Sequence, residues 1–169
     1  MIREMLFALG AGAAMAAHAA DIQSITGLAA DWAEAHAQQA LAQGTALSPA
    51  EVAIARRVGV QDPSKVRIRI VDELPSLQDP RLVAAAGRIG LMPQAASGMT
   101  IGYAVMLKRG AEGDARLLSH ELRHVAQYEQ QGGIRPFLAV HIPALMRFGY
   151  EDSPFERDAR AHEVIPPRP

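Results

Sequence analysis

Cysteine is absent from this sequence of 169 residues. Disulfide bonds, cysteine-based zinc sites, iron–sulfur clusters and thiol nucleophiles are therefore excluded. An excess of one charge sign is absent too, because 17 basic residues are balanced by 18 acidic ones. Since a nucleic-acid footprint would require clustered excess lysine and arginine, we expect no nucleic-acid partner.

Long hydrophobic runs are also missing. The longest apolar stretch, from Met5 to Ala17, is too short for a comfortable membrane span, so no stable span is expected. It follows the positive charge of Arg3 and precedes the small residues Ala17-His18-Ala19, a pattern typical of a signal peptide. We therefore predict a signal peptide at residues 1–19 and a periplasmic or secreted protein. The alternative is an alanine-rich first helix of a cytoplasmic protein.

What is present is the composition of one globular domain, with 49% hydrophobic and 21% charged residues. We expect residues 20–169 to form a single domain. Its first part, residues 20–97, would be mainly helical, and a second part, residues 98–163, would hold a metal site.

Helical spacing and capping residues predict most of the elements. Apolar spacing predicts a helix from Asp21 to Gln43, and a Ser48-Pro49-Ala50-Glu51 capping box begins another. Asp79-Pro80 begins a further helix that Gly87, Gly90 and Pro93 end. Three more are expected over about 114–131, over 136–148 with a bend or break at Pro143, and from Ser153 onward.

Two segments have the character of strands. Residues 66–70 alternate between apolar and arginine side chains, and Ile101 to Leu107 is rich in β-forming residues between two glycines. Helices before and after a small sheet, without regular βαβ alternation, predict an α+β fold.

The sequence His-Glu-x-x-His at residues 120–124 carries the chemistry. Residues four apart share one face of a helix, so the imidazoles of His120 and His124 can converge on one zinc ion at ~2.0–2.1 Å each. Zinc lowers the pKa of a bound water to about 7, so the adjacent Glu121 can take its proton as general base and pass it to a leaving amine. The alternative is a core helix with two ordinary hydrogen-bonded histidines.

A catalytic zinc site needs a third protein ligand. The position six residues after His124 is Gln130, so the ligand must come from later in the chain. We favour Glu156, in the first turn of the helix that starts at Ser153, although the same residue could instead cap that helix. Asp158 is a candidate to orient a ligating imidazole. The other candidate ligands are His141, Glu151, Asp152, Asp158, His162 and Glu163.

The motif and its surroundings resemble a known group. Residues 117–127 are similar to the H-E-L-x-H-V-x-Q signature of bacterial zincin-like metallopeptidase domains, including those found with contractile injection systems. Residues 100–105 resemble the T-x-G-x-x-I strand upstream in those domains, and residues 154–159 resemble their P-x-E-x-x-A segment. The resemblance covers about residues 98–163. It departs from the larger gluzincins at Arg160, where those have an aspartate.

The resemblance implies a minimal zincin-like fold, with a small sheet packed on the active-site helix and additional N-terminal helices. It implies one Zn²⁺ per chain held by His120, His124 and Glu156, with Glu121 as base. A peptide or protein substrate would bind along the strand Ile101 to Leu107. A catalytically inactive module of the same fold and a metal-free helical interaction domain are the rival hypotheses.

Three tyrosines are candidate contacts for the substrate or the transition state. Tyr103 lies on the predicted strand, Tyr128 lies one turn after His124, and Tyr150 precedes the helix of Glu156. A tyrosine hydroxyl can donate a hydrogen bond to an oxyanion. Ordinary strand packing is the alternative for Tyr103, and a buried, hydrogen-bonded tyrosine is the alternative for Tyr128.

Overall fold

A computed structural model describes the backbone of residues 2–90 and 95–165, and side chains from residue 20 onward. Within these ranges, six α-helices and a four-stranded mixed sheet form an α+β fold, which confirms the predicted fold class. The helices are α1 (Ile2–Gln43), α2 (Pro49–Arg57), α3 (Pro80–Arg88), α4 (Ala115–Gln131), α5 (Ile134–Asp152) and α6 (Pro154–Ala161). The strands are β1 (Thr45–Ala46), β2 (Arg67–Val71), β3 (Gly98–Ile101) and β4 (Ala104–Lys108), and a 3₁₀ helix spans Pro63–Lys65.

The sheet has the strand order β1-β2-β4-β3. β4 pairs with β2 in parallel and with β3 in antiparallel fashion, so β3 is an edge strand. The predicted single strand from Ile101 to Leu107 is therefore wrong. Gly102 has a φ of 61° and starts a two-residue turn that folds the segment into the hairpin β3–β4.

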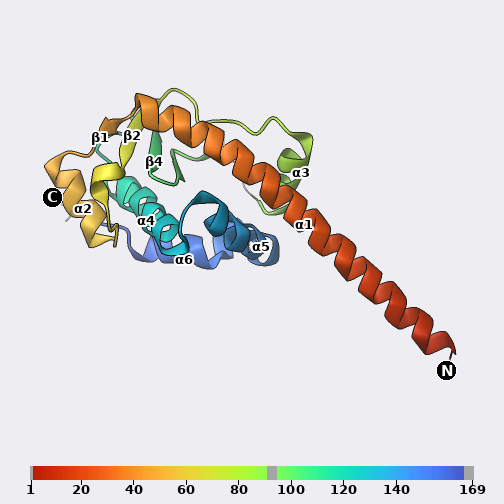
Figure 1. Ribbon diagram of the computed structural model, residues 1–169. Coiled ribbons are helices and arrows are strands. Elements are labelled where there is room, and N and C mark those ends of the chain that lie inside the picture. Colours follow the sequence, from red (N-terminus) through yellow and green to blue (C-terminus); the bar gives the residue numbers. More distant parts are fainter. Residues whose placement is uncertain (1, 91–94, 166–169) are drawn as a thin grey trace.

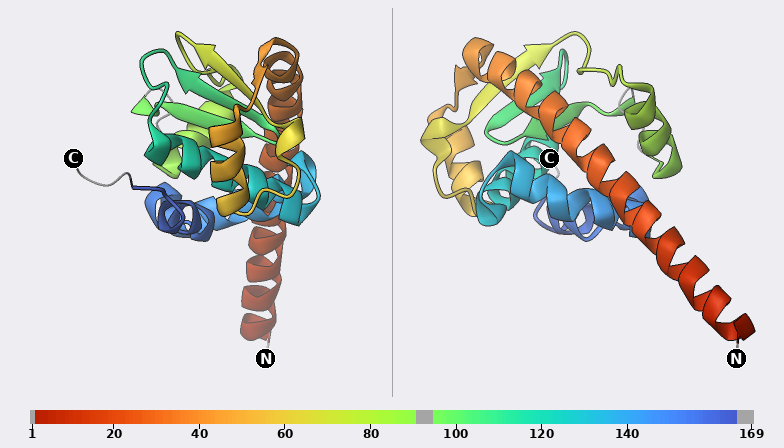
Figure 2. Two further views of the ribbon diagram at one scale, coloured as in Figure 1. Left: turned by 90° about the vertical axis from the view of Figure 1, so that its left-hand side faces the viewer. Right: turned by 45° about the vertical axis from the view of Figure 1, so that its right-hand side comes forward.

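The sheet lies between two helical layers (Figure 2). Because strand side chains alternate, Val105 and Leu107 face the core formed with α2 and α4, whereas Ala104 and Met106 face α1. On α1, alanines at 33, 37 and 40 occupy this contact, and their small size lets the helix approach the sheet closely.

α1 is the longest element, runs across the molecule and extends well beyond the other elements at its N-terminal end (Figure 1). The segment predicted as a helix, Asp21 to Gln43, is the part of α1 that packs on the domain. α1 itself begins earlier, at Ile2. The side chains of residues 1–19 lie outside the described part, and the signal peptide stays a prediction. In the described ranges, no helix has the combination of length and apolarity needed to cross a membrane.

The capping residues act largely as predicted. Ser48 and Glu51 form the reciprocal capping box of α2, and Asp79 and Asp114 cap α3 and α4 through their side chains. Pro93 lies outside the described residues. In α5 the residue with non-helical backbone angles is Gly149 (φ 76°, ψ 174°) rather than Pro143. The interruption therefore falls six residues later than predicted, just before the helix that carries Glu156.

Candidate metal centre

α4 presents His120 and His124 side by side. The helix is fixed at its start by Asp114, whose Oδ1 accepts hydrogen bonds from the amides of Arg116 (2.9 Å) and Leu117 (3.1 Å). The two imidazoles are one helical turn apart, and their Nε2 atoms lie 3.2 Å from each other. Both side chains are largely buried.

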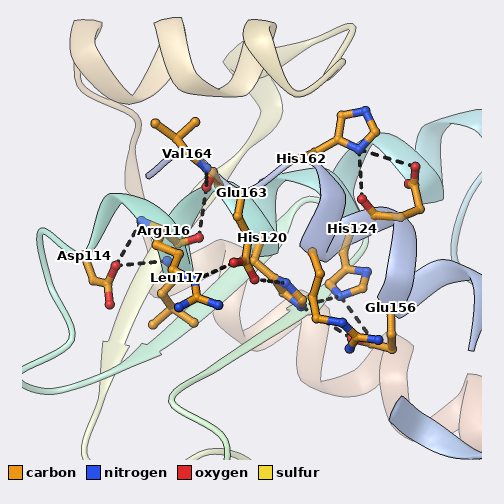
Figure 3. A network of polar contacts seen from close by, with 12 residues as sticks. Asp114, Arg116, Leu117, His120, His124, Glu156, His162, Glu163 and Val164 are labelled. Carbon is orange, nitrogen blue, oxygen red and sulfur yellow. Dashed lines mark hydrogen bonds and ion pairs between the residues drawn. The ribbon is translucent and has the colours of Figure 1, made fainter. Parts of the chain in front are cut away.

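α6 brings Glu156 to the same place (Figure 3). Its Oε2 lies 3.4 Å from His120 Nε2, and its Oε1 lies 3.5 Å from His124 Nε2. Each of the three side chains offers one possible ligand atom, and these three atoms all lie within 4.8 Å of one another. The structure thus brings together the three residues that the sequence singled out as a group able to hold a metal ion.

The capping alternative for Glu156 is not adopted. Ser153 forms no side-chain cap at the start of α6, and its amide donates to the carbonyl of Tyr150 at 3.2 Å instead of to Glu156. The Oε2 atom of Glu156 is buried and has no hydrogen-bond partner among the described residues. The carboxylate is therefore available for a cation between it and the two imidazoles.

The other ring nitrogen of each histidine faces an acceptor. His120 Nδ1 lies 3.1 Å from Glu163 Oε1, and His124 Nδ1 lies 2.8 Å from Gln127 Oε1. The amide of Gln127 is oriented by its own donors, because its Nε2 donates to Phe155 O (2.9 Å) and to Asp158 Oδ2 (2.7 Å). Each Nδ1 is accordingly the protonated nitrogen, and each Nε2 is left with a lone pair.

Three electron-pair donors, two Nε2 atoms and one carboxylate, therefore point at one another. Such a group could hold a metal ion, because nitrogen and carboxylate donors are common ligands of divalent metals. Burial acts to lower the pKa of His120, but the close contact of its Nε2 with Glu156 Oε2 and the charges of Glu121 and Glu156 outweigh burial and raise it. The donor set fits a divalent metal.

Glu121 lies beside this group and is 5% exposed. Its Oε2 accepts a hydrogen bond of 2.6 Å from Thr100 Oγ1 on β3. Burial raises the pKa of Glu121 above its ordinary value. The carboxylate occupies space that only glycine leaves open on the neighbouring strand, because a Cβ atom at Gly98 would lie 2.6 Å from Glu121 Oε1.

Further contacts lie on the Nδ1 side of the two histidines. Asp158, predicted to orient an imidazole, reaches His124 only through Gln127 and forms two hydrogen bonds with Arg123 at 2.7 and 3.1 Å. The direct partners, Gln127 and Glu163, were not predicted in this role. Gln127 could have been found from its spacing, three residues after His124 on one helix. Glu163 carries no local signal, because it lies beyond α6.

The candidate tyrosines lie in different places. Tyr150 is half-buried beside Glu156, and burial followed by the Glu156 charge raises its pKa. Tyr128 is buried, and its hydroxyl donates to Thr100 O at 3.4 Å. Tyr103 is not part of the site, since its hydroxyl donates to Glu129 Oε1 at 3.0 Å. Glu129 in turn accepts from the amides of Gln61 and Asp62, so this cluster serves the loop before β2.

A largely apolar cavity of about 240 Å³ opens beside the group. Glu121, His124 and Glu156 are among the residues that line it, together with Tyr128 and Tyr150. The metal group and the buried carboxylate are thus reached from a common space.

Among known proteins, one family model matches. It is described as the eCIS core domain, and it matches residues 48–132, half of the chain. The match covers α2 to α4 and so includes His120, Glu121 and His124, but it ends before Glu156. No curated protein and no solved structure matches the chain.

Proposed function

The chain belongs to the eCIS core domain family, associated with extracellular contractile injection systems, and we propose that within such a multiprotein system it is a zinc-dependent metallopeptidase of zincin-like fold. The convergence of His120 Nε2, His124 Nε2 and Glu156 carries the proposal. Both Nδ1 atoms are already engaged, so the two Nε2 atoms and the Glu156 carboxylate are left free to bind a cation.

The three residues would hold zinc with its remaining position free, and zinc would supply a lowered pKa for a bound water and polarisation of the substrate carbonyl. Glu121 then accepts the proton of the attacking water and delivers it to the nitrogen of the leaving amine. Its raised pKa suits the first step, because a carboxylate of higher pKa is a stronger base. Thr100 fixes the carboxylate through its 2.6 Å hydrogen bond.

An extended peptide would bind along β3. This strand lies at the edge of the sheet. Its Thr100 donates a hydrogen bond to Glu121, and its Gly98 lies next to the Glu121 carboxylate. Addition of a peptide strand to a sheet edge uses main-chain hydrogen bonds and therefore accepts many sequences. The proposal thus moves the substrate strand from Ile101–Leu107 to Gly98–Ile101.

Tyr150 is the tyrosine best placed to assist. It lines the same space as Glu121 and Glu156, and its raised pKa keeps the hydroxyl protonated as a hydrogen-bond donor. We expect it to donate to the oxyanion that forms at the substrate carbonyl.

The test compares wild type with Glu121→Gln, using Glu73→Gln as the matched control. Glu73 is exposed (82% of its side chain) and makes only a surface ion pair with Lys108 at 3.6 Å, so the same chemical change there should alter little. Zinc content and cleavage of a peptide library are measured for all three proteins. We expect equal zinc in each, with cleavage lost by at least about a hundredfold only in Glu121→Gln. Equal zinc with no cleavage in wild type would favour the inactive metal-binding module instead.

A further inference from the structure

We propose that Arg123 is a positioning residue of the metal centre, which docks α6 onto α4 and thereby determines where the carboxylate of Glu156 lies. Arg123 is the fourth residue of the His-Glu-x-x-His motif. Among the described residues, its hydrogen bonds go to Asp158 and Val58 and to none of the three candidate ligands. The inference rests on the metal centre of the proposed function, but it does not depend on peptidase activity.

α6 depends on polar contacts because it buries little apolar surface. Of its eight residues, the buried ones are Glu156 and Ala159, and a single methyl group removes little surface from water. Phe155 is half-buried and adds one edge-on aromatic contact with α5. After the helix, the amide of Val164 donates to Ser119 Oγ at 2.7 Å, which holds the following segment but does not fix the rotation of α6 about its own axis.

Arg123 fixes this rotation through a two-point ion pair. Its Nε donates to Asp158 Oδ2 at 2.7 Å and its Nη2 to Oδ1 at 3.1 Å, the fork geometry in which arginine binds a carboxylate most strongly. At 100° per residue, Glu156 and Asp158 extend to either side of the buried Ala159. A rotation of α6 that withdrew Glu156 from the histidines would therefore have to break the pair between Arg123 and Asp158.

The guanidinium of Arg123 is itself held from behind by α2. Its Nη1 donates to the carbonyl of Val58 at 2.9 Å, at the C-terminal end of that helix, where a positive charge is favoured. Gly59 follows with a φ of 98°, and a Cβ atom there would lie 2.9 Å from the same Nη1. Gln127 adds a second anchor for Asp158, since its Nε2 donates to Oδ2 at 2.7 Å.

These contacts connect the family match to the third ligand. Val58, Arg123 and Gln127 lie within the matched residues 48–132, whereas Glu156 and Asp158 lie beyond them. The matched segment thus carries two candidate ligands, the candidate base and also the anchor for the helix that supplies the third ligand. Its arginine and glutamine act on the metal centre through α6.

The experiment measures the metal affinity of folded protein, because an ion pair that only stabilised the fold would leave that affinity unchanged. Arg123→Ala, Asp158→Ala and the double variant are compared with wild type at a temperature where circular dichroism shows each to be folded. Arg157→Ala is the matched control, since it removes the same side chain from the exposed side of α6. Zinc affinity is measured by competition with a chelator, and the visible spectrum of bound Co²⁺ reports the ligand geometry.

We expect Arg123→Ala to weaken zinc binding about 10- to 100-fold and to give a Co²⁺ spectrum like that of Glu156→Ala. The double variant should bind no more weakly than either single variant, because all three remove the same contact. Arg123→Lys, which keeps the charge but loses the fork, should show an intermediate loss. Arg157→Ala should change the affinity by less than about twofold.

Wild-type affinity and an unchanged Co²⁺ spectrum in folded Arg123→Ala would overturn the inference and leave the metal centre intact. If Arg123→Ala does not fold, the same result in Asp158→Ala decides. Additive losses in the double variant, or an equal loss in Arg157→Ala, would also overturn it, because the effect would then not pass through this ion pair. Failure of wild type to bind zinc would instead overturn the proposed function and the inference with it.

Discussion

His120 and His124 face each other with 3.2 Å between their Nε2 atoms, although the opposite nitrogen of each ring is engaged by an acceptor. Two lone pairs at this distance repel unless a cation lies between or beside them. Glu156 adds a negative charge at 3.4 and 3.5 Å from the same two atoms. The three side chains are therefore arranged so that they could hold a metal ion, and the partners on the Nδ1 side maintain that arrangement.

Glu163→Ala should weaken zinc binding by about 10- to 100-fold. The substitution removes the acceptor that holds the Nδ1 proton of His120 and so leaves the tautomer and the ring orientation undetermined. Glu163→Gln should have a smaller effect, because an amide oxygen still accepts. Competition with a chelator of known affinity measures the change.

Arg116→Ala is the matched control for this prediction. Arg116 binds the other oxygen of Glu163 at 2.5 Å, but its side chain is 64% exposed, and exposed ion pairs contribute little. We expect zinc affinity to fall by less than about fivefold. A loss as large as that of Glu163→Ala would show that the ion pair, and not the contact with His120, determines affinity.

Gly98→Ala should reduce catalysis while zinc stays bound. The new methyl group would lie 2.6 Å from Glu121 Oε1 and 2.9 Å from its Cγ and Cδ, so the buried carboxylate or β3 must move. We expect kcat to fall at least about tenfold and the free energy of unfolding to fall by about 1–3 kcal/mol. Gly87→Ala in α3, where nothing lies within 4 Å, should instead stabilise the protein by up to about 1 kcal/mol.

His141→Phe should make stability less dependent on pH. His141 is stacked on Phe137 and meets Phe155 edge-on, and burial lowers its pKa from 6.5 to about 4. A histidine whose pKa is lower in the folded state contributes stability above pH 6.5, and this contribution is lost as pH falls toward 4. Chemical denaturation at pH 7 and 4.5 should show wild type losing about 2 kcal/mol more than the variant. Parallel losses in the two proteins would contradict a neutral buried His141.

The sequence predicted most of the features that depend on residues close together in the chain. Capping residues placed the starts of α2, α3 and α4, and the spacing of His120 and His124 put them on one helical face. The hairpin at Gly102 was missed because β-forming residues flank the turn on both sides, so the segment resembles one continuous strand. A two-residue turn with one glycine gives a weak signal in such a context.

The rest depends on contacts between distant segments. Glu163 reaches His120 across 43 positions, and the apolar cavity is lined by residues of α1, α3, β3, α4 and α5, which are distant in sequence. Neither follows from periodicity, which determines which face of a helix is buried but not what covers it. Glu156 was an intermediate case, because its residue type and helix position suited both capping and ligation. Only its tertiary position on α6 decided that it faces the histidines.

We propose that His120, His124 and Glu156 together hold one zinc ion. Elemental analysis of the protein purified without chelators tests it most directly, with Glu156→Ala prepared in parallel. We predict close to one zinc ion per chain in wild type and a large loss of zinc in Glu156→Ala, because two imidazoles alone do not complete a catalytic zinc site. Wild-type protein without bound metal after exposure to excess zinc, or full zinc content in Glu156→Ala, would contradict the account.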